Sequence, residues 1–429
     1  MNKNLSAKGK FGAGSWLLCI LAGGAIALII KRFIFGIGSV TNLNDAYPWG
    51  FWIGLDVLTG VALAAGGFTL TAAIYIWGNK KYYPLARPAI LTALLGYLMF
   101  VVALVIDLGR GPVMWHMFVP SMWQHDSVMF EVGWCVATYL IILIFEFLPG
   151  VLEKYDRKNL LGLWTALTPI IVIVLLTMFT YAMTYSIGWA LVVLAITVLF
   201  ELLQKTGIVP AGRPVPILLI MAGVLLSCLH QSSLGSLYLI VPHKLHPLWH
   251  TPVLPFLFLF SAVAVGPAMV IFEGLLSARV FKRNRELHLL SGLAKTLPFL
   301  LAIYLLLRIA DIVGRGVVAA AFELNLQSVM FWVELTVGTI IPIVLLGTSE
   351  IVRSEKGLFW ASLCVILGVF IHRLNVSVIG IQSRSWEGYH PAWTEILISV
   401  GIVSIGLLIF RYIARNFPIY EESITLETG

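Results

Sequence analysis

Four polar residues in a row, His230-Gln231-Ser232-Ser233, interrupt a long apolar stretch of the chain at residues 215–240. An imidazole changes charge near neutral pH, so a histidine with hydroxyl neighbours can give a hydrogen bond and a proton to a carbonyl group such as that of a quinone. The alternative is a histidine that joins two helices by binding a backbone carbonyl. The first interpretation makes His230, Gln231 and Ser232 candidates for a quinone pocket.

Ionisable side chains recur in other apolar stretches. They are Asp56, Asp107, Arg110, Glu131, Arg308, Asp311, Glu334, His372, Arg373 and Glu395. Charges within a bilayer are rare, face the protein interior and often mark a functional site. The spacing of Asp107 and Arg110, and of Arg308 and Asp311, also allows neutralisation along one helix. We interpret the whole set as the lining of a polar cavity.

The composition defines the class of protein that must position these groups. Of the 429 residues, 59% are hydrophobic and 11% are charged, and the mean hydropathy is +0.95. Soluble domains carry about 25% charged residues. This chain could not cover its surface with polar groups in water, so we expect an all-α integral membrane protein.

The apolar runs predict twelve transmembrane helices. The expected spans are residues 14–35, 49–78, 88–108, 128–152, 162–182, 186–203, 215–240, 253–278, 290–312, 327–349, 357–380 and 392–413. The stretch 162–203 is broken only around Ser186, yet as one helix it would be about 60 Å long, twice the thickness of a bilayer. We therefore predict a hairpin of two spans there.

The basic residues fall mainly on one side of these spans. Of 28 Lys and Arg residues, 19 lie in the segments that face one side. The opposite loops hold Arg110, Lys244, Arg315 and Arg384, and the spans hold Lys31, Arg32, Lys295, Arg308 and Arg373. Loops rich in Lys and Arg stay cytoplasmic. We expect both termini in the cytoplasm and the buried polar groups in the non-cytoplasmic half of the membrane. The net charge of +7 then faces anionic membrane lipid and indicates no nucleic-acid partner.

Two sequence echoes predict an internal duplication. Residues 127–132 (SVMFEV) resemble residues 328–334 (SVMFWVE), and residues 106–111 resemble residues 310–316. Their order and orientation agree, which indicates two four-helix bundles related by a parallel repeat. The expected units are a first bundle at 1–152, an extra hairpin at 153–214, a second bundle at 215–349, and a C-terminal helix pair with a cytoplasmic tail at 350–429.

The chain offers few ligands for a resident cofactor. Its four cysteines are scattered singly, so we expect no iron–sulfur cluster, and we expect no metal site. Haem b held by two histidines needs two that face each other within spans, and only His230 and His372 lie there. We therefore expect no haem in this chain.

Several motifs resemble those of the NrfD/polysulfide-reductase membrane subunit family. They are Pro48-Trp-Gly-Phe-Trp-Ile-Gly-Leu-Asp56, Ala65-Gly66-Gly67, Asp107-Leu-Gly-Arg110, Ser127-Val-Met-Phe-Glu131, His230-Gln-Ser-Ser-Leu-Gly235, His246-Pro-Leu-Trp249 and Phe272-Glu-Gly274. The resemblance covers nearly the whole chain. Within the family the chain is most similar to the membrane subunits of [NiFe] hydrogenase-2-type enzymes, often labelled cytochrome b-type.

This resemblance implies a quinone-reactive membrane anchor without a redox cofactor of its own. It implies a menaquinone or ubiquinone pocket near the periplasmic face, and electron exchange with a periplasmic, ferredoxin-like iron–sulfur subunit and with hydrogenase large and small subunits. Glu131 resembles the acidic residue implicated in proton handling, Asp56 lies in the second-span motif, and His230 matches a family motif. The hairpin at 162–203 departs from the family pattern, which leaves the partner complex open.

We therefore expect a subunit that is not an enzyme by itself but exchanges electrons with a membrane quinone. Asp56, Glu131 and His230 would bind the quinone ring or relay its protons, and Arg110 or Arg308 would stabilise negative charge on the reduced ring. A secondary transporter or channel is the alternative, because buried acids and a parallel repeat also occur there. A membrane subunit for multihaem cytochromes and a purely structural anchor are further alternatives.

Overall fold

The computed structural model describes residues 11–44, 47, 49–208, 216–241, 244–382 and 388–420. In this part of the chain, twelve helical spans are long and apolar enough to cross a membrane, so the predicted number of spans is confirmed. The described residues form no β-strand beyond an isolated bridge between Asn44 and Tyr47. Arg213, Arg384 and the acidic tail lie outside the described residues.

Most spans are built around one long α-helix. These helices are α1 (Ala13–Phe35), α4 (Ala86–Asp107), α5 (Val128–Lys154), α6 (Lys158–Thr184), α7 (Ile187–Lys205), α8 (Ile217–Ser236), α9 (Leu254–Phe281) and α17 (Trp393–Asn416). Short 3-10 turns accompany them at η1 (Ile37–Ser39), η4 (Lys80–Leu85), η5 (Gly111–Phe118), η6 (Pro120–Met122), η7 (Leu237–Ile240) and η8 (Val318–Phe322).

The remaining spans are assembled from shorter pieces. The second span comprises η2 (Ile53–Thr59), α2 (Gly60–Leu63), α3 (Gly66–Thr71) and η3 (Ala72–Ile76), and the ninth comprises α10 (Leu287–Ala294) and α11 (Leu297–Gly314). The tenth comprises α12 (Leu326–Leu335), η9 (Thr336–Ile340) and α13 (Ile341–Leu346). After α14 (Ser349–Val352), the eleventh comprises α15 (Glu355–Leu374) and η10 (Asn375–Ile379), followed by α16 (Gly380–Gln382).

The predicted hairpin at 162–203 is confirmed as α6 and α7. Tyr185 adopts a left-handed conformation with φ of 49° and ends α6. The Ser186 hydroxyl then accepts a hydrogen bond from the Trp189 N–H at 3.4 Å and caps the start of α7. A single capped turn therefore reverses the chain between two spans.

Three spans contain π-helical stretches beside ionisable residues. Asp56 lies within η2, Glu334 lies two residues before η9, and Arg373 lies two residues before η10. Runs of π-helix are rare and occur frequently at functional sites. The irregular backbone and the buried charges thus coincide.

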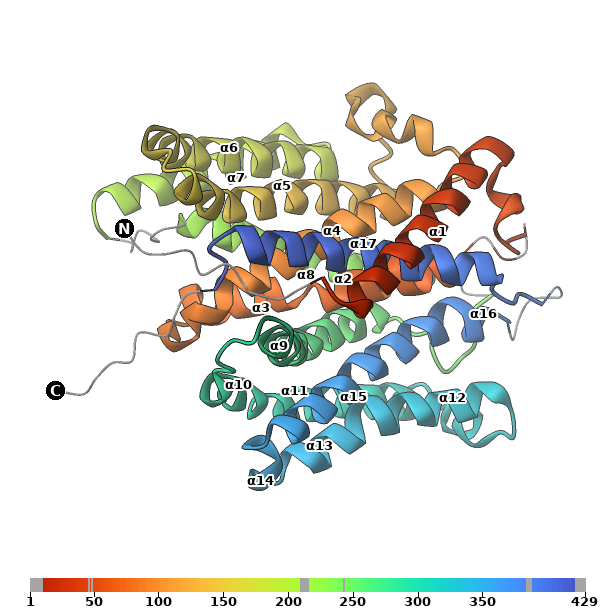
Figure 1. Cartoon of the computed structure of the whole chain (residues 1–429). Helices are drawn as coiled ribbons and strands as arrows, with labels where there is room; N and C mark the ends of the chain where they lie inside the picture. Colours follow the sequence, from red (N-terminus) through yellow and green to blue (C-terminus); the bar gives the residue numbers. More distant parts are fainter. Residues whose placement is uncertain are drawn as a thin grey trace.

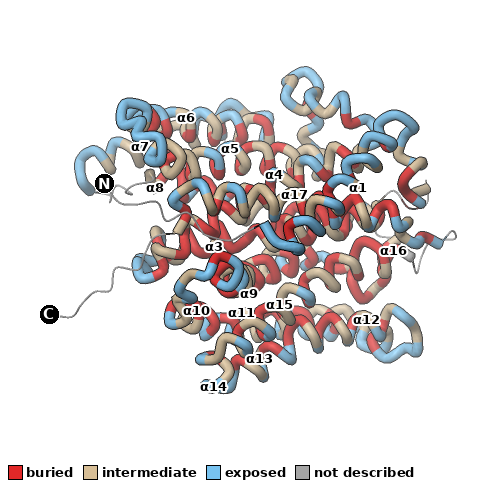
Figure 2. Tube along the Cα trace, in the orientation of Figure 1, coloured by how far each residue is buried: buried red, intermediate tan, exposed pale blue. Residues whose placement is uncertain are grey.

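The helices form one bundle (Figure 1). α5, α6 and α7 lie along one edge, and α11, α12, α13 and α15 lie along the other. α1 packs on α17, and α8 packs on both α5 and α9. Small residues allow close crossings, as where Gly338 meets the backbone of Gly368 and Gly401 meets Ala25. Figure 2 shows the buried residues concentrated in this interior, with exposed ones on the outer surface of α6 and α7.

The proposed duplication, the unit boundaries and the orientation in the membrane stay predictions. The packing adds that helices on either side of two predicted boundaries are neighbours, since α5 contacts α8 and α9 contacts α15. The predicted units therefore share one interior.

Candidate functional site

His230 lies fully buried where α8 meets α4 and α5. Its Nδ1 is 2.8 Å from the carbonyl oxygen of Leu226, one turn earlier in α8, and its Nε2 is hydrogen-bonded to the hydroxyl of Tyr97 in α4. A carbonyl oxygen can only accept, so Nδ1 carries a proton and Nε2 of the neutral ring accepts from Tyr97. Both nitrogens of His230 are thus engaged.

Two tyrosines surround this imidazole. The ring of Tyr97 stands almost perpendicular to that of His230, with centroids 5.1 Å apart, and it makes a second edge-to-face contact with Tyr139 of α5 at 4.7 Å. Both tyrosines are buried. Neither could be identified from sequence, because a tyrosine in an apolar run is usual and its partner on another helix leaves no signal in the spacing.

Gln231 completes the backbone of the second span. Its Nε2 donates to the carbonyl oxygen of Val61 at 2.9 Å. The Ala65 N–H, which a regular α-helix would direct to Val61, binds Ala62 instead. Gln231 therefore satisfies a carbonyl that the break between α2 and α3 releases, while its own Oε1 finds no partner among the described residues.

Ser233 connects α8 to the acidic residue of α5. Its hydroxyl lies 2.5 Å from Oε1 of Glu131 and 2.9 Å from the carbonyl oxygen of Leu229. Ser232, by contrast, donates only within its own helix, to Leu229 at 2.6 Å. Glu131, His230 and Gln231 are therefore linked through one turn of α8 as a polar cluster, with contacts to α5, α4 and the second span.

Asp56, also in the second span, contacts α17. It is 8% exposed, and its Oδ2 accepts a hydrogen bond from the hydroxyl of Ser399 in α17 at 2.6 Å. Asp56 lines a groove of about 720 Å³ between α1, the second span, α4, α9 and α17. The groove is mostly apolar, with Leu18, Leu63, Met99, Phe100, Leu276 and Phe410 among its lining residues.

The groove has polar groups at both ends. Asp56 and Thr59 lie near the start of the second span, whereas Glu273 and Ser277 of α9 and Arg411 of α17 lie near the opposite ends of their helices. A long apolar groove with polar groups at its ends is suited to an amphipathic molecule with a polar ring and a hydrocarbon tail.

Asp107 ends α4 beside a buried cation. Arg32 of α1 donates from Nε to the carbonyl oxygen of Ile106 at 2.6 Å and from a terminal nitrogen to that of Leu108 at 2.5 Å. A cation at the C-terminus of a helix satisfies its last carbonyls and its dipole. This contact accounts for a basic residue in the first span. Arg110, also predicted for the site, is exposed.

Glu395 is the centre of a hydrogen-bonded cluster at the same end of the bundle as Asp107. Its Oε1 accepts from the backbone N–H of Asn42 at 2.9 Å and of Ala392 at 3.0 Å, and its Oε2 accepts from the hydroxyl of Tyr389. Burial raises the pKa of Tyr389, which keeps that hydroxyl protonated as a donor. These hydrogen bonds fix the start of α17, the helix that holds Ser399.

Arg308 lies in a separate cluster in the other half of the molecule. It is fully buried, and its guanidinium is 3.7 Å from Oε1 of Glu334. Glu334 also accepts from Trp249 at 3.0 Å and from Asn375 at 2.8 Å. Asp311 pairs with Arg315 at 2.6 Å, so Arg308 and Asp311 do not neutralise each other.

The structure thus divides the predicted site residues among several places. Glu131, His230, Gln231 and the neighbouring Ser233 form one cluster, and Asp56 lines the groove. Asp107 and Arg110 lie at one end, and Arg308 belongs to the Glu334 cluster. Within the described residues, no three His, Cys, Asp or Glu side chains gather as metal ligands.

Twelve apolar spans around buried polar clusters define a multi-pass integral membrane protein. The chain belongs to the family described as polysulphide reductase, NrfD, which matches residues 39–383.

Curated relatives cover most of the chain. The "Probable Ni/Fe-hydrogenase 2 b-type cytochrome subunit" of Escherichia coli is 32% identical over 91% of this chain and 88% of its own length. The "Menaquinone reductase, integral membrane subunit" of Nitratidesulfovibrio vulgaris is 25% identical over 91% and 87%, respectively. A selenate reductase subunit of Mesobacillus selenatarsenatis is 23% identical over 89% and 88%.

Proposed function

We propose that this chain is the quinone-reactive membrane subunit of a respiratory oxidoreductase complex. Its relatives are named as subunits of a hydrogenase, a menaquinone reductase and a selenate reductase. The observation that carries the proposal is the apolar groove of about 720 Å³ that ends at Asp56. A quinone ring would lie at Asp56 and its isoprenoid tail along the groove.

Some side chains near Asp56 would bind the quinone ring, and others would exchange protons with it. A quinone takes up two electrons and two protons to become a quinol. Asp56, oriented by Ser399, is the group that contacts the ring. Phe100 lines the groove and contacts Tyr97, with ring centroids 6.5 Å apart, so the Tyr97–His230 pair lies directly behind the groove wall.

Glu131 supplies a second carboxyl group and is linked to the helix of His230 through Ser233. Ser233, three residues after His230 in α8, binds Glu131. The tautomer of His230 leaves Nε2 to take a proton from its donor, the Tyr97 hydroxyl. The two clusters together would bind a quinone and exchange its protons. Electrons would reach the ring from a partner protein, since this chain supplies no cluster of cysteines.

The proposed partner and orientation are supported by the sequence. We propose a periplasmic, ferredoxin-like iron–sulfur subunit of a [NiFe] hydrogenase, because of the hydrogenase-2 relative, which is 32% identical. The distribution of basic residues supports cytoplasmic termini and a quinone ring toward the periplasmic face. Multihaem cytochromes remain an alternative partner.

A haem b does not fit the two histidines within the spans. Ligation by two histidines needs a free ring nitrogen on each, facing a common space. His230 uses both nitrogens for Tyr97 and Leu226. His372 lies in the separate Glu334 cluster, where its Nδ1 is bonded to Arg373 at 2.8 Å. The cytochrome label of a relative therefore does not carry over to these residues.

The test is Asp56→Asn, which keeps the shape of the side chain and removes its ability to bind and release a proton. We expect quinone-coupled turnover of the purified complex to fall about a hundredfold. Reduction of a soluble dye by the catalytic partner should be unchanged. Asp126→Asn, in an exposed loop, is the matched control. An Asp56→Asn complex with full quinone turnover contradicts the proposal.

A further inference from the structure

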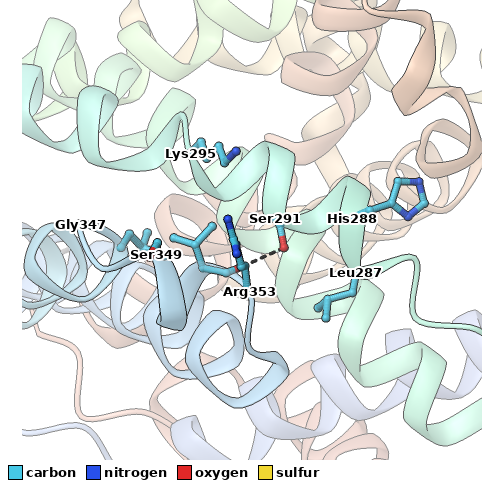
Figure 3. Close-up of a pocket in the computed structure, with 9 residues that line it drawn as sticks. Leu287, His288, Ser291, Lys295, Gly347, Ser349 and Arg353 are labelled. Carbon is cyan, nitrogen blue, oxygen red and sulfur yellow. Dashed lines mark hydrogen bonds between the residues drawn. The ribbon is translucent and has the colours of Figure 1, made fainter.

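A basic pocket opens where the ninth span begins and the tenth span ends, and it shares no lining residue with the groove. It has a volume of about 500 Å³ and is lined by α10, the α13–α14 connection and α14. His288, Lys295 and Arg353 supply its ionisable side chains, and none of its lining residues is acidic. Figure 3 shows Lys295 and Arg353 toward one end of the pocket and His288 toward the other.

A hydrogen bond holds the two walls of the pocket together. Ser291 of α10 donates a hydrogen bond to the carbonyl oxygen of Val352 in α14 at 2.8 Å, which ties the two sides together (Figure 3). Leu346 and Val352 are buried beneath it. Lys295 and Arg353 are both exposed, and neither forms an ion pair with a carboxylate among the described residues.

The pocket lies at the depth of lipid headgroups. The ninth span, Leu287–Gly314, has 28 residues and is about 42 Å long, whereas the hydrocarbon core of a bilayer is about 30 Å thick. α11 alone, with 18 residues, nearly fills that core at about 27 Å. With α11 in the hydrocarbon core, α10 would extend into the headgroup layer and Lys295 would lie at the boundary.

An apolar surface continues from the pocket toward the membrane centre. α11 packs against α13, and Phe299 and Val344 on these two helices are exposed. A ligand held here would meet cations at its head and hydrocarbon along its tail. Basic pockets between transmembrane helices bind anionic lipid headgroups.

We propose that this pocket binds the phosphodiester headgroup of an anionic phospholipid, with Lys295 and Arg353 contacting the phosphate and the acyl chains lying over Phe299 and Val344. The lipid would hold α10 against α14 and thereby stabilise the half of the bundle that contains the Glu334 cluster. This site is independent of the quinone proposal, because none of its residues lines the groove.

The test titrates dioleoyl-phosphatidylglycerol into the delipidated, purified complex and follows binding by native mass spectrometry. Lys295→Gln/Arg353→Gln should weaken binding about thirty-fold, from the loss of two cations near the membrane surface. Arg279→Gln/Lys282→Gln removes the same charge from exposed positions outside the pocket and should bind like the wild type. Equal binding by the pocket variant and the control would overturn the proposal.

Two further probes identify the source of the phosphate. Dioleoyl-phosphatidylcholine, which has no net charge, should bind at least tenfold more weakly. Glycerophosphoglycerol, the same headgroup without acyl chains, should not compete at equal concentration. Competition by this soluble compound, or equal binding of phosphatidylcholine, would show that the pocket does not recognise an anionic lipid.

Discussion

The hydroxyl of Tyr97 donates a hydrogen bond to Nε2 of His230, whose Nδ1–H is already bound to the carbonyl oxygen of Leu226. The two residues are 133 positions apart and come from α4 and α8. The pair gives a buried imidazole one defined tautomer and one basic nitrogen, held behind the wall of the apolar groove. A proton taken up by this imidazole would therefore go to Nε2, the nitrogen that faces the Tyr97 hydroxyl.

Tyr97→Phe should separate this arrangement from the rest of the fold. The ring and its packing remain, but Nε2 loses its donor, at a cost of about 1–3 kcal/mol for an unsatisfied buried group. We expect quinone-coupled turnover to fall about a hundredfold while the complex still assembles. Steady-state rates with quinone and with a soluble dye, measured on the same preparation, check this. Unchanged quinone turnover would show that the pair is structural.

Ser233 and Ser232 provide a matched comparison within one turn of α8. Ser233→Ala removes the hydroxyl that binds Glu131, whereas Ser232→Ala removes one that binds only its own helix. We expect the first to lower quinone turnover about tenfold or more and the second to leave it near wild type. Equal effects of the two alanines on the measured rates would argue against a role for the Ser233–Glu131 contact.

Gly406→Leu should obstruct the groove. Gly406 lines it, and a Cβ there would already lie 3.3 Å from Cγ of Met99. We expect the apparent KM for a long-chain quinone to rise at least tenfold, and that for a short-chain analogue to rise less. Gly23→Leu is the control, because a Cβ at Gly23 meets nothing within 4 Å. Both changes favour helix by a similar amount. A KM unaffected by Gly406→Leu would place the tail elsewhere.

Glu334→Gln should act on stability. The change leaves Arg308 buried without its carboxylate, which costs about 3–5 kcal/mol. We expect a clearly lower midpoint of thermal unfolding for the purified complex, with the KM for quinone unchanged. Glu323→Gln, at an exposed position whose carboxylate accepts a hydrogen bond from Asn325, should leave the midpoint near wild type. A wild-type midpoint for Glu334→Gln would show that Arg308 finds another counter-charge.

The absence of haem is a further prediction. Both ring nitrogens of His230 are bonded, and His372 lies in the separate Glu334 cluster, so the purified chain should give no haem b signal in a pyridine haemochrome assay. One haem per chain in that assay would contradict the expected cofactor content, and ligation by His230 would require this residue to release Tyr97 or Leu226.

The number of spans and the hairpin of α6 and α7 could be predicted because they rest on chain length and hydropathy. A helix needs about 20 apolar residues to cross a bilayer, and a stretch of about 60 Å cannot be one span. The presence of His230 and Glu131 in a buried region followed from the same reasoning, since charges within spans face the interior.

The partners of these residues could not be predicted, because they depend on how each helix is rotated and which helix lies beside it. Ser399, Tyr97 and Arg32 give no sequence signal of their contacts with Asp56, His230 and the end of α4. Close crossings at small residues set those neighbours, as at Gly401 and Ala25. Arg308 looked like a partner of Asp311 from its spacing, but the rotation of α11 directs it to Glu334 instead.

The most direct test of the quinone site is photolabelling of the purified complex with an azido-quinone, followed by mass-spectrometric mapping of the modified residues. The account predicts label on η2, α4 and α17, the elements that line the groove near Asp56, and loss of that label when excess unmodified quinone is present. Saturable label confined to the segments around Arg308 and Glu334, with none along the groove, would contradict it.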